Sequence, residues 1–229
     1  MPLPLPLLRR SHTDARGPPI ACSAVTRHTK EATVGAMTNH YVDAMKPRVA
    51  FQGELGAFSE LAIRQQWPTG AVPVPCRTFP DAIAAVRRGN ADHAVIPVEN
   101  AIVGAVKVAL DALRAADIEV MERPELRVPI HLCLLAPRGA TLAELRDVHS
   151  HTVALAQCRM FFARHGWLVP APHDDTAGAA RMVAERGDRT VGAVASEIAA
   201  VRYDLDIIAR HIEDMPANWT RFLVISASS

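Results

Sequence analysis

The chain has 229 residues, of which 49% are hydrophobic and 21% are charged, and its formal net charge is +1. This is an ordinary globular composition, and the chain is long enough to bury a core as one large domain or as two smaller lobes. The balanced charge gives no support for nucleic-acid or membrane binding by bulk electrostatics. No apolar run reaches the roughly 18 residues that a membrane span needs.

The first 47 residues differ from the rest of the chain. Prolines interrupt them from the second residue onward, basic residues outnumber acidic ones, and no hydrophobic period is present. The basic pair follows the short apolar stretch, which is the reverse of a secretory signal. We therefore predict a disordered extension over 1–47. Met37 or Met45 could then be the true start of the protein.

The cysteines are scattered and form no C-x-x-C pair, so their spacing indicates neither a zinc site nor a disulfide framework. We interpret them as reduced thiols, mostly core residues, in a cytoplasmic protein. They are Cys22, Cys76, Cys133 and Cys158.

Short apolar runs alternate with helical periods from residue 48 onward. One helix has Thr78 as its predicted cap, begins at Pro80 and ends near Gly89, an arrangement typical of helices. The predicted strands of the first half are 49–51, 71–74, 94–98 and 118–122, and its predicted helices end near 66, 89 and 116.

The second half continues this alternation and ends on an apolar strand. Strands that alternate with helices at this spacing predict an α/β fold with mainly parallel sheets. The predicted strands are 128–135, interrupted by His131, one that ends at 149–151, 190–194, 207–211 and 221–225. The predicted helices are 142–146, 153–165, 177–185 and 196–202, the third capped by 174–176 and the fourth by Ser196.

Two polar junctions in the first half could carry chemistry, because α/β sheets present ligands at strand ends near helix N-termini. At the first, glycines in 53–59 would let the backbone approach a ligand, with Ser59 at a helix start. Alternatively this is a plain glycine turn with Ser59 as the cap. At the second, Glu99 and Asn100 follow a strand directly and lead to Gly104.

Two further junctions lie in the second half. Ser150 and His151 precede a helix, where they could bind a ligand or serve as a cap and a core histidine. His149 and His151 share a strand face, but no third metal ligand has a recognisable spacing. The segment 174–176 could do acid/base work with its paired carboxylates, or it could simply cap the next helix.

The segment 218–222 places an amide, a hydroxyl and a guanidinium directly before an apolar strand. An Arg at such a position needs a partner for its charge. Together with the four junctions, it predicts one cleft lined by helix N-termini, hydroxyls, amides and one Arg. Such a cleft favours a small anionic ligand, in particular a carboxylate.

These segments resemble, in order, the motifs of the prephenate dehydratase family. The last one matches the N-x-T-R-F signature, and the junction after the third strand matches P-x-E-N. The matching segments are 53–59, 97–100 with Gly104, 150–158, 175–180, 193–196 and 218–222. The resemblance covers the chain from about 48 to 225.

The resemblance implies two α/β lobes arranged like a periplasmic binding protein, with the active site in the cleft between them. Lobe one would be about 48–123 plus 212–229, and lobe two about 124–211. The implied reaction converts prephenate to phenylpyruvate in phenylalanine biosynthesis, with no metal or organic cofactor. The implied assembly is a homodimer or a higher homo-oligomer.

The resemblance also assigns roles to residues. It places catalysis at Asn218, Thr220 and Arg221, with Thr220 as proton or hydrogen-bond donor to the leaving hydroxyl and Arg221 paired with a carboxylate or orienting the site. The implied substrate contacts are Ala57, Phe58, Ser59, Glu99, Asn100, Ser150, His151, Gln157, Thr176, Ala177 and Phe222.

The sequence departs from the family pattern at four positions, Ala101, Val103, Ala105 and Thr152. Two hydroxyls that could contact the substrate are missing, and each absent hydrogen bond is expected to weaken binding by roughly 1 kcal/mol. Arogenate, the amino analogue, is therefore an alternative substrate. The chain stops at Ser229 without a phenylalanine-sensing ACT domain, so we expect no feedback inhibition through such a domain.

Two alternatives belong to other functional classes. The chain could be a non-catalytic relative that only captures a carboxylate ligand, and Ala101 and Ala105 favour this. It could also be an interaction partner of a chorismate mutase or a similar enzyme. The intact Asn218, Thr220 and Arg221 favour catalysis.

Overall fold

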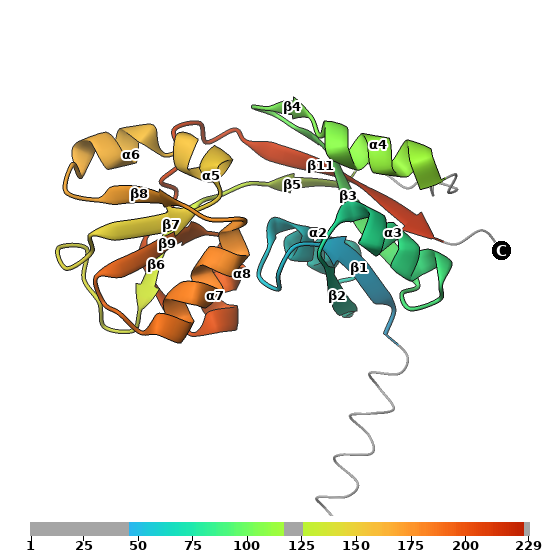
Figure 1. Cartoon of the computed structure of the whole chain (residues 1–229), viewed down its shortest axis with the longest axis horizontal. Coiled ribbons are helices and arrows are strands. Elements are labelled where there is room, and N and C mark those ends of the chain that lie inside the picture. Colours follow the sequence, from blue (N-terminus) through green and yellow to red (C-terminus); the bar gives the residue numbers. More distant parts are fainter. Residues whose placement is uncertain (1–45, 117–125, 227–229) are drawn as a thin grey trace, which may run out of the picture. The chain divides into compact units, whose positions relative to one another are not determined.

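The computed structural model describes residues 46–116 and 126–226, which belong to one compact unit. Most of the predicted extension over 1–47 and the predicted strand at 118–122 lie outside the described residues. Figure 1 shows two lobes, each built on its own sheet. Within the described part of the chain, every helix is too short or too polar to cross a lipid bilayer.

The first lobe contains a six-stranded sheet with helices on both faces. Alternate residues of β1 point to opposite faces, so Val49 and Phe51 pack with α2 whereas Ala50 packs with α3 and α4. The strand order is β2-β1-β3-β11-β5, and β4 pairs with β3. The elements are β1 (Arg48–Gln52), α2 (Phe58–Gln66), β2 (Val72–Cys76), α3 (Phe79–Arg87), β3 (His93–Asn100), β4 (Gly104–Ala105), α4 (Lys107–Ala116), β5 (Leu126–Pro129) and β11 (Trp219–Ser226).

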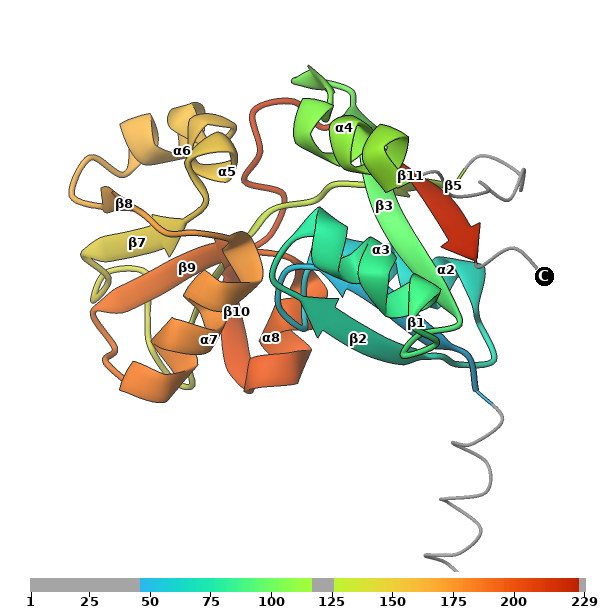
Figure 2. The same cartoon turned by 45° about the vertical axis from the view of Figure 1, so that its right-hand side comes forward.

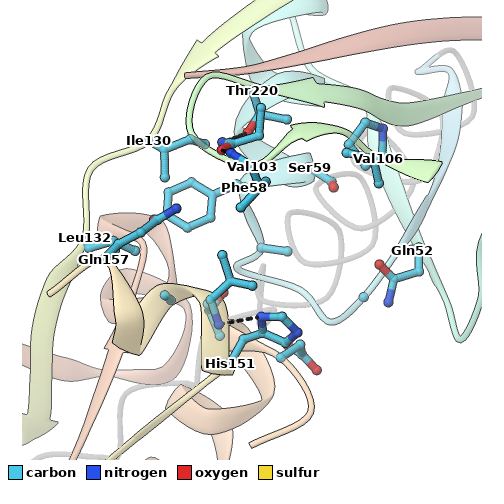
Figure 3. A pocket seen from close by; sticks show the side chains of 18 of the residues that line it. Gln52, Phe58, Ser59, Val103, Val106, Ile130, Leu132, His151, Gln157 and Thr220 are labelled. Atoms are coloured by element: carbon cyan, nitrogen blue, oxygen red, sulfur yellow. Dashed lines mark hydrogen bonds between the residues drawn. The ribbon is translucent and has the colours of Figure 1, made fainter. Parts of the chain in front are cut away.

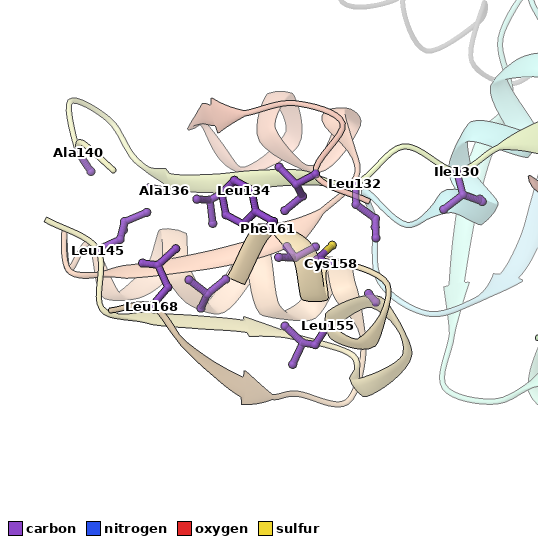
Figure 4. Close-up of a cluster of buried hydrophobic side chains, with 14 residues drawn as sticks. Ile130, Leu132, Leu134, Ala136, Ala140, Leu145, Leu155, Cys158, Phe161 and Leu168 are labelled. Carbon is purple, nitrogen blue, oxygen red and sulfur yellow. The ribbon is translucent and has the colours of Figure 1, made fainter. Parts of the chain in front are cut away.

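The second lobe contains a five-stranded sheet in the order β10-β6-β9-β7-β8, again covered on both faces (Figure 2). Its larger core cluster lies against α5 and α6 and includes Leu134, Leu145, Cys158 and Phe161 (Figure 4). The elements are β6 (Cys133–Pro137), β7 (Asp147–Ser150), α5 (Thr152–Ala156), α6 (Arg159–Arg164), β8 (Val169–Pro172), α7 (Thr176–Arg186), β9 (Val191–Ala195), α8 (Glu197–Tyr203) and β10 (Leu205–Ala209).

Two chain segments join the lobes. The first, 130–132, lies between β5 and β6, and the second, 210–218, lies between β10 and β11. They run beside each other and are joined by two backbone hydrogen bonds. Ile130 N–H donates to Asn218 O and Ile212 N–H donates to Leu132 O, each with an N···O distance of 3.0 Å. We call them the crossing segments.

The predicted two-lobed α/β fold is confirmed, but its sheets are mixed rather than mainly parallel. β1 pairs in parallel with β2 and β3, and β7 with β8 and β9. Both pairings of β6 and both of β11 are antiparallel. These are the strands next to the crossing segments, where the chain leaves one lobe and later returns in the opposite direction.

The predicted strand at 128–135 is wrong as a single element. His131 separates β5, which pairs with β11 in the first sheet, from β6 in the second. Residues 126–129 therefore lie in the first sheet, although the predicted boundary near 124 placed them in lobe two.

Two other local predictions need correction. The segment 142–146 contains a turn instead of a helix, and 153–165 forms two short helices that break at Gln157 and Cys158. The strand β8 was not predicted because Pro170 and Pro172 are atypical of strands. It lies at a sheet edge, where a missing N–H is tolerated.

Three predicted helix caps are confirmed. The side chains of Thr78, Asp175 and Ser196 accept hydrogen bonds from the backbone N–H groups of Asp81, Gly178 and Ala199. Of the cysteines in the described residues, Cys133 and Cys158 are buried core residues and Cys76 is half-buried, and all three are free thiols. Burial raises the pKa of the Cys158 thiol to about 12, so this thiol is unreactive at neutral pH.

Candidate active site

A cavity of about 390 Å³ lies between the two lobes and receives residues from both (Figure 3). The carboxyl ends of β1, β3 and β7 lead into it, together with the start of β11 and the N-termini of α2 and α7. Nine of the predicted site residues line this cavity: Ala57, Phe58, Ser59, Asn100, His151, Gln157, Thr176, Thr220 and Phe222.

Asn100 organises the first-lobe wall of the cavity. Its Nδ2 lies 3.0 Å from each of three acceptors, Asn218 Oδ1, Trp219 O and Thr220 Oγ1. Its Oδ1 accepts from the backbone N–H groups of Ile102 and Val103. Because its polar atoms are all engaged within the protein, Asn100 acts on a ligand mainly by fixing Thr220.

The contact from Asn100 sets the polarity of the Thr220 hydroxyl. A hydroxyl has one proton and two acceptor lone pairs. Because Asn100 Nδ2 can only donate, Thr220 Oγ1 is the acceptor in that hydrogen bond, and its own proton remains available. In Figure 3 Thr220 stands at the cavity. Thr220 can therefore donate a hydrogen bond to a ligand oxygen.

Asn218 does not line the cavity, but it connects the two walls. This buried amide accepts from Asn100, and its Nδ2 lies 3.3 Å from Gln157 Oε1 in the second lobe. Gln157 therefore has its Oε1 occupied, which leaves its Nε2 donor for the cavity (Figure 3).

The second-lobe wall contributes His151 and the start of α7. His151 Nδ1 accepts from Val153 N–H over 3.3 Å, so the neutral ring carries its proton on Nε2. Thr176 is the first residue of α7, an eleven-residue helix whose N-terminus favours negative charge. On the opposite wall α2 begins at Phe58 without a capping side chain, so its first N–H groups can serve a ligand.

Arg221 is not on the cavity wall, contrary to the prediction of a cleft containing one Arg. Adjacent residues on a strand point to opposite faces, and Thr220 occupies the cavity side. Arg221 Nε and Nη2 each lie 2.9 Å from Glu99 Oε2, its cross-strand partner on β3. Glu99, also predicted to contact the substrate, is likewise outside the lining. Among the described residues that line the cavity, none is Lys or Arg.

Two other predicted contacts are buried outside the cavity lining. Ser150 is fully buried, and its Oγ donates to Val194 O over 2.6 Å, so it holds β7 against β9. It does not cap α5, because His151 takes that position. Ala177 is fully buried in the first turn of α7.

The glycine turn at the first junction joins the lobes as well as shaping the cavity. Gly56 has φ +92°, and a Cβ there would lie 3.0 Å from Ala199 Cα on α8. Ser196 Oγ donates to Gly56 O over 2.5 Å, and Tyr203 Oη donates to Leu55 O over 2.6 Å. The turn therefore packs directly on the second lobe. This packing accounts for the glycine at position 56 without any need for a ligand there.

A family model for prephenate dehydratase matches residues 49–229. The chain belongs to the prephenate dehydratase family. It is 38% identical over 197 residues to arogenate dehydratase/prephenate dehydratase 2 of Arabidopsis thaliana, covering 86% of this chain and 51% of that protein. It is 43% identical over 178 residues to a bifunctional N-acyl-homoserine lactone acylase/prephenate dehydratase of Komagataeibacter europaeus, covering 78% and 62%.

A solved relative has the same fold. The prephenate dehydratase of Arthrobacter aurescens in complex with L-Phe aligns with a TM-score of 0.72 at 30% identity, covering 80% of this chain and 61% of that one. The chain thus spans about half to two thirds of the length of these relatives.

Of the four departures from the pattern of the prephenate dehydratase family, one lies at the cavity. Val103 lines it, whereas Ala101, Ala105 and Thr152 are exposed and outside the lining. The two missing hydroxyls belong to Ala101 and Ala105, so neither absence lies at the cavity, and the valine at position 103 is the departure that most directly changes the site.

Most of the apolar lining was not predicted from the sequence, and Asp174, which lines the cavity, was predicted only as a possible acid/base or capping residue and not as a substrate contact. Ile130 and Leu132 flank His131 on a crossing segment. In an extended segment alternate residues point to the same side, so the sequence could have predicted that Ile130 and Leu132 share a side that His131 does not. The lining residues that carried no predicted role are Gln52, Pro97, Val106, Ile130, Leu132, Val153 and Ala154.

Proposed function

We propose that this chain catalyses the decarboxylative dehydration of prephenate to phenylpyruvate, as the family assignment suggests. The substrate loses its ring carboxylate as carbon dioxide and its ring hydroxyl as water, after that hydroxyl takes up one proton. The ring becomes aromatic, which supplies much of the driving force. The protein must therefore position the substrate and assist the leaving hydroxyl, which requires no metal or organic cofactor.

The hydrogen bond from Asn100 to Thr220 carries the proposal. It leaves the Thr220 proton available to the cavity, where the departing hydroxyl needs a donor. A Thr hydroxyl is a weak acid, so a hydrogen bond that strengthens as the C–O bond breaks is sufficient for this role. His151 Nε2 is a second donor on the facing wall.

The apolar part of the wall suits the carboxylate that leaves. Phe58, Ile130 and Leu132 surround one side of the cavity, and Val103 and Val106 lie on another (Figure 3). A carboxylate held against such groups is poorly solvated, and its charge disperses as carbon dioxide departs.

The carboxylate that stays in the product needs hydrogen-bond donors. We place it near the N-terminus of α2, where the N–H groups of Phe58 and Ser59 and the Ser59 hydroxyl are close to the cavity. The N-terminus of α7 at Thr176 is the second candidate. Because Arg221 pairs with Glu99, it acts as a positioning residue for β11.

The test is phenylpyruvate formation from prephenate by the purified full chain. We expect turnover in the wild type, a loss of about 10²–10³-fold in kcat for Thr220→Ala, and partial activity for Thr220→Ser, which keeps the hydroxyl. Turnover that survives unchanged in Thr220→Ala would contradict the role of Thr220. An inactive wild type, with arogenate also inert, would favour the non-catalytic binding hypothesis.

Arogenate is a second candidate substrate, and Asp174 favours it. This exposed carboxylate lies at the cavity and could pair with the ammonium group that replaces the keto group of prephenate. Relatives include proteins named for both substrates. Comparing kcat/KM for prephenate and arogenate separates the two.

The acylase named in one relative requires its own assay, because the apolar cavity wall could also hold an acyl chain. We expect no release of homoserine lactone from an N-acyl-homoserine lactone, since the described lining shows no nucleophile paired with a base.

We also propose a cytoplasmic homodimer or higher homo-oligomer. The buried free thiols Cys133 and Cys158 support a reducing compartment. Light scattering after gel filtration measures the oligomer, and a monomer at all concentrations would contradict it.

A further inference from the structure

A cluster of two histidines and a glutamate lies on the crossing segments. His131 comes from the first segment, and His211 and Glu213 come from the second. Each offers one ligand atom, and these atoms all lie within 4.8 Å of one another. The site thus brings together residues that are 82 positions apart in the sequence.

We propose that His131, His211 and Glu213 bind a divalent zinc ion that ties the two crossing segments together. Two imidazoles and one carboxylate are a ligand set that zinc accepts, with water completing a tetrahedron. This inference is independent of the proposed catalytic function.

The spacing of the ligand atoms matches a metal centre. Zinc bonds of about 2.0–2.1 Å in a tetrahedron place neighbouring ligand atoms about 3.3 Å apart. Glu213 Oε1 lies 2.9 Å from His131 Nδ1 and 3.5 Å from His211 Nδ1. Small adjustments of the two rings, whose centroids are 4.5 Å apart, would therefore admit an ion.

The surroundings hold the ligands in place and leave the ion a route of entry. The Glu213 side chain is 1% exposed, and its second oxygen accepts from Leu132 N–H over 2.8 Å, a contact that orients the first oxygen. The His131 and His211 side chains are 44% and 62% exposed. An ion can therefore reach the site from solution.

The backbone at His211 is also unusual. His211 has φ +52°, a left-handed conformation that non-glycine residues adopt rarely. The neighbouring Ile212 N–H is fixed by Leu132 O, so the crossing segments together hold His211 in this conformation. Such a conformation is a reason to look for a function at the residue.

The position of the site predicts its effect. Ile130 and Leu132, the neighbours of His131, line the catalytic cavity, whereas His131 itself does not. Asn218, which bonds Asn100, ends the second crossing segment. A zinc ion that fixes both segments would therefore restrain the two lobes relative to each other next to the cavity.

The first experiment measures zinc binding to the untagged full chain after chelator treatment and desalting. The variants are His131→Gln and His211→Asn, since Asn tolerates the left-handed backbone. His165→Gln, in the second lobe, is the matched control, and histidines 12, 28 and 40 are present in every protein. We expect one equivalent that both site variants weaken at least about tenfold and the control does not. Equal binding by all four proteins would overturn the proposal.

Two further readouts test the geometry. Cobalt(II) in place of zinc should give the intense visible absorption of a four-coordinate ion, and only with an intact site. Zinc should also slow amide hydrogen exchange at Leu132 and Ile212, where the crossing segments meet. Zinc binding without slower exchange would overturn the restraint of the crossing segments.

Discussion

Asn100 Nδ2 lies 3.0 Å from Thr220 Oγ1, although the two residues are 120 positions apart. The pair exists because β3 and β11 are antiparallel neighbours and place Thr220 opposite Asn100. One amide therefore positions the hydroxyl and directs its proton away from Asn100.

The first prediction concerns this pair. In Asn100→Asp the carboxylate can only accept, so the Thr220 hydroxyl should turn its proton toward residue 100 and away from the substrate. We expect kcat to fall about 10²-fold, while KM changes less. Steady-state kinetics with prephenate measures both, and Thr220→Ser serves as the control that keeps a hydroxyl. An Asp variant with wild-type kcat would show that the direction of the proton is unimportant.

A second prediction concerns Arg221 and Glu99, whose pair lies outside the cavity lining and is partly exposed. The coupling energy of such a pair is about 1 kcal/mol or less. We expect Arg221→Gln to reduce kcat far less than Thr220→Ala does. Adding Glu99→Gln to the Arg221→Gln variant should reduce kcat little further. A double-mutant cycle in stability and in kcat/KM checks this. A loss in Arg221→Gln as large as that in Thr220→Ala would mean that the guanidinium contacts the substrate.

Arg221 shows which part of the site could be predicted from the sequence. The motifs predicted that Thr220, Asn100 and Gln157 lie in one cleft, and all three line the cavity. This was predictable because the motifs lie near strand ends, where α/β folds bind ligands. Successive residues of a strand point to opposite faces, so a cavity position for Thr220 excludes Arg221 from the same wall. The exclusion of Arg221 could therefore have been predicted from the sequence.

Other features depend on contacts that no local pattern reports. Ser150 looked like a helix cap, but its hydroxyl bonds Val194 O in a neighbouring strand. The break at His131 divides one apolar run between two sheets, and periodicity cannot distinguish this from one long strand. The proposed zinc ligands His131 and Glu213 likewise meet only because two crossing segments lie together.

The third prediction concerns substrate choice. Asp174→Asn removes a carboxylate at the cavity without changing the size of the side chain. We expect the ratio of kcat/KM for arogenate to that for prephenate to fall about tenfold, the effect of about 1.4 kcal/mol, because the ammonium group loses its partner. Asp147→Asn, on β7 outside the lining, is the control. An unchanged ratio would remove Asp174 as a determinant of specificity.

The fourth prediction compares two glycines with positive φ. Gly56→Ala should destabilise the protein by about 3 kcal/mol, because a left-handed Ala costs 1–2 kcal/mol and its Cβ would press on the α8 backbone. Gly89→Ala has φ +70° and nothing within 4 Å of the new Cβ, so only the conformational cost applies. Urea unfolding measures the free energy of unfolding of both variants. The difference between their losses gives the contribution of the contact between the Gly56 turn and α8. Equal losses would mean that the Gly56 turn does not pack tightly on α8.

The last prediction concerns Glu60, a buried carboxylate that also joins the lobes. It accepts from Gly56 N–H at 2.7 Å, from Arg64 at 2.8 Å and from Arg202 of the second lobe at 3.1 Å. Burial alone would raise the pKa of Glu60, but these donors outweigh burial and hold the pKa below its usual range. Glu60→Gln should therefore lower the free energy of unfolding at pH 7 by about 2–3 kcal/mol.

The depressed pKa of Glu60 fixes the direction of the pH dependence. The stability that the carboxylate contributes is fully present above the unfolded-state pKa of about 4.3, and it is lost as the pH falls through the lower folded-state pKa. The difference between wild type and Glu60→Gln should thus shrink below about pH 4, whereas Glu185→Gln, an exposed control on α7, should show little difference at any pH. Urea unfolding from pH 7 to pH 3 measures this. A difference that stays constant over that range would mean that Glu60 contributes through shape and not through its charge.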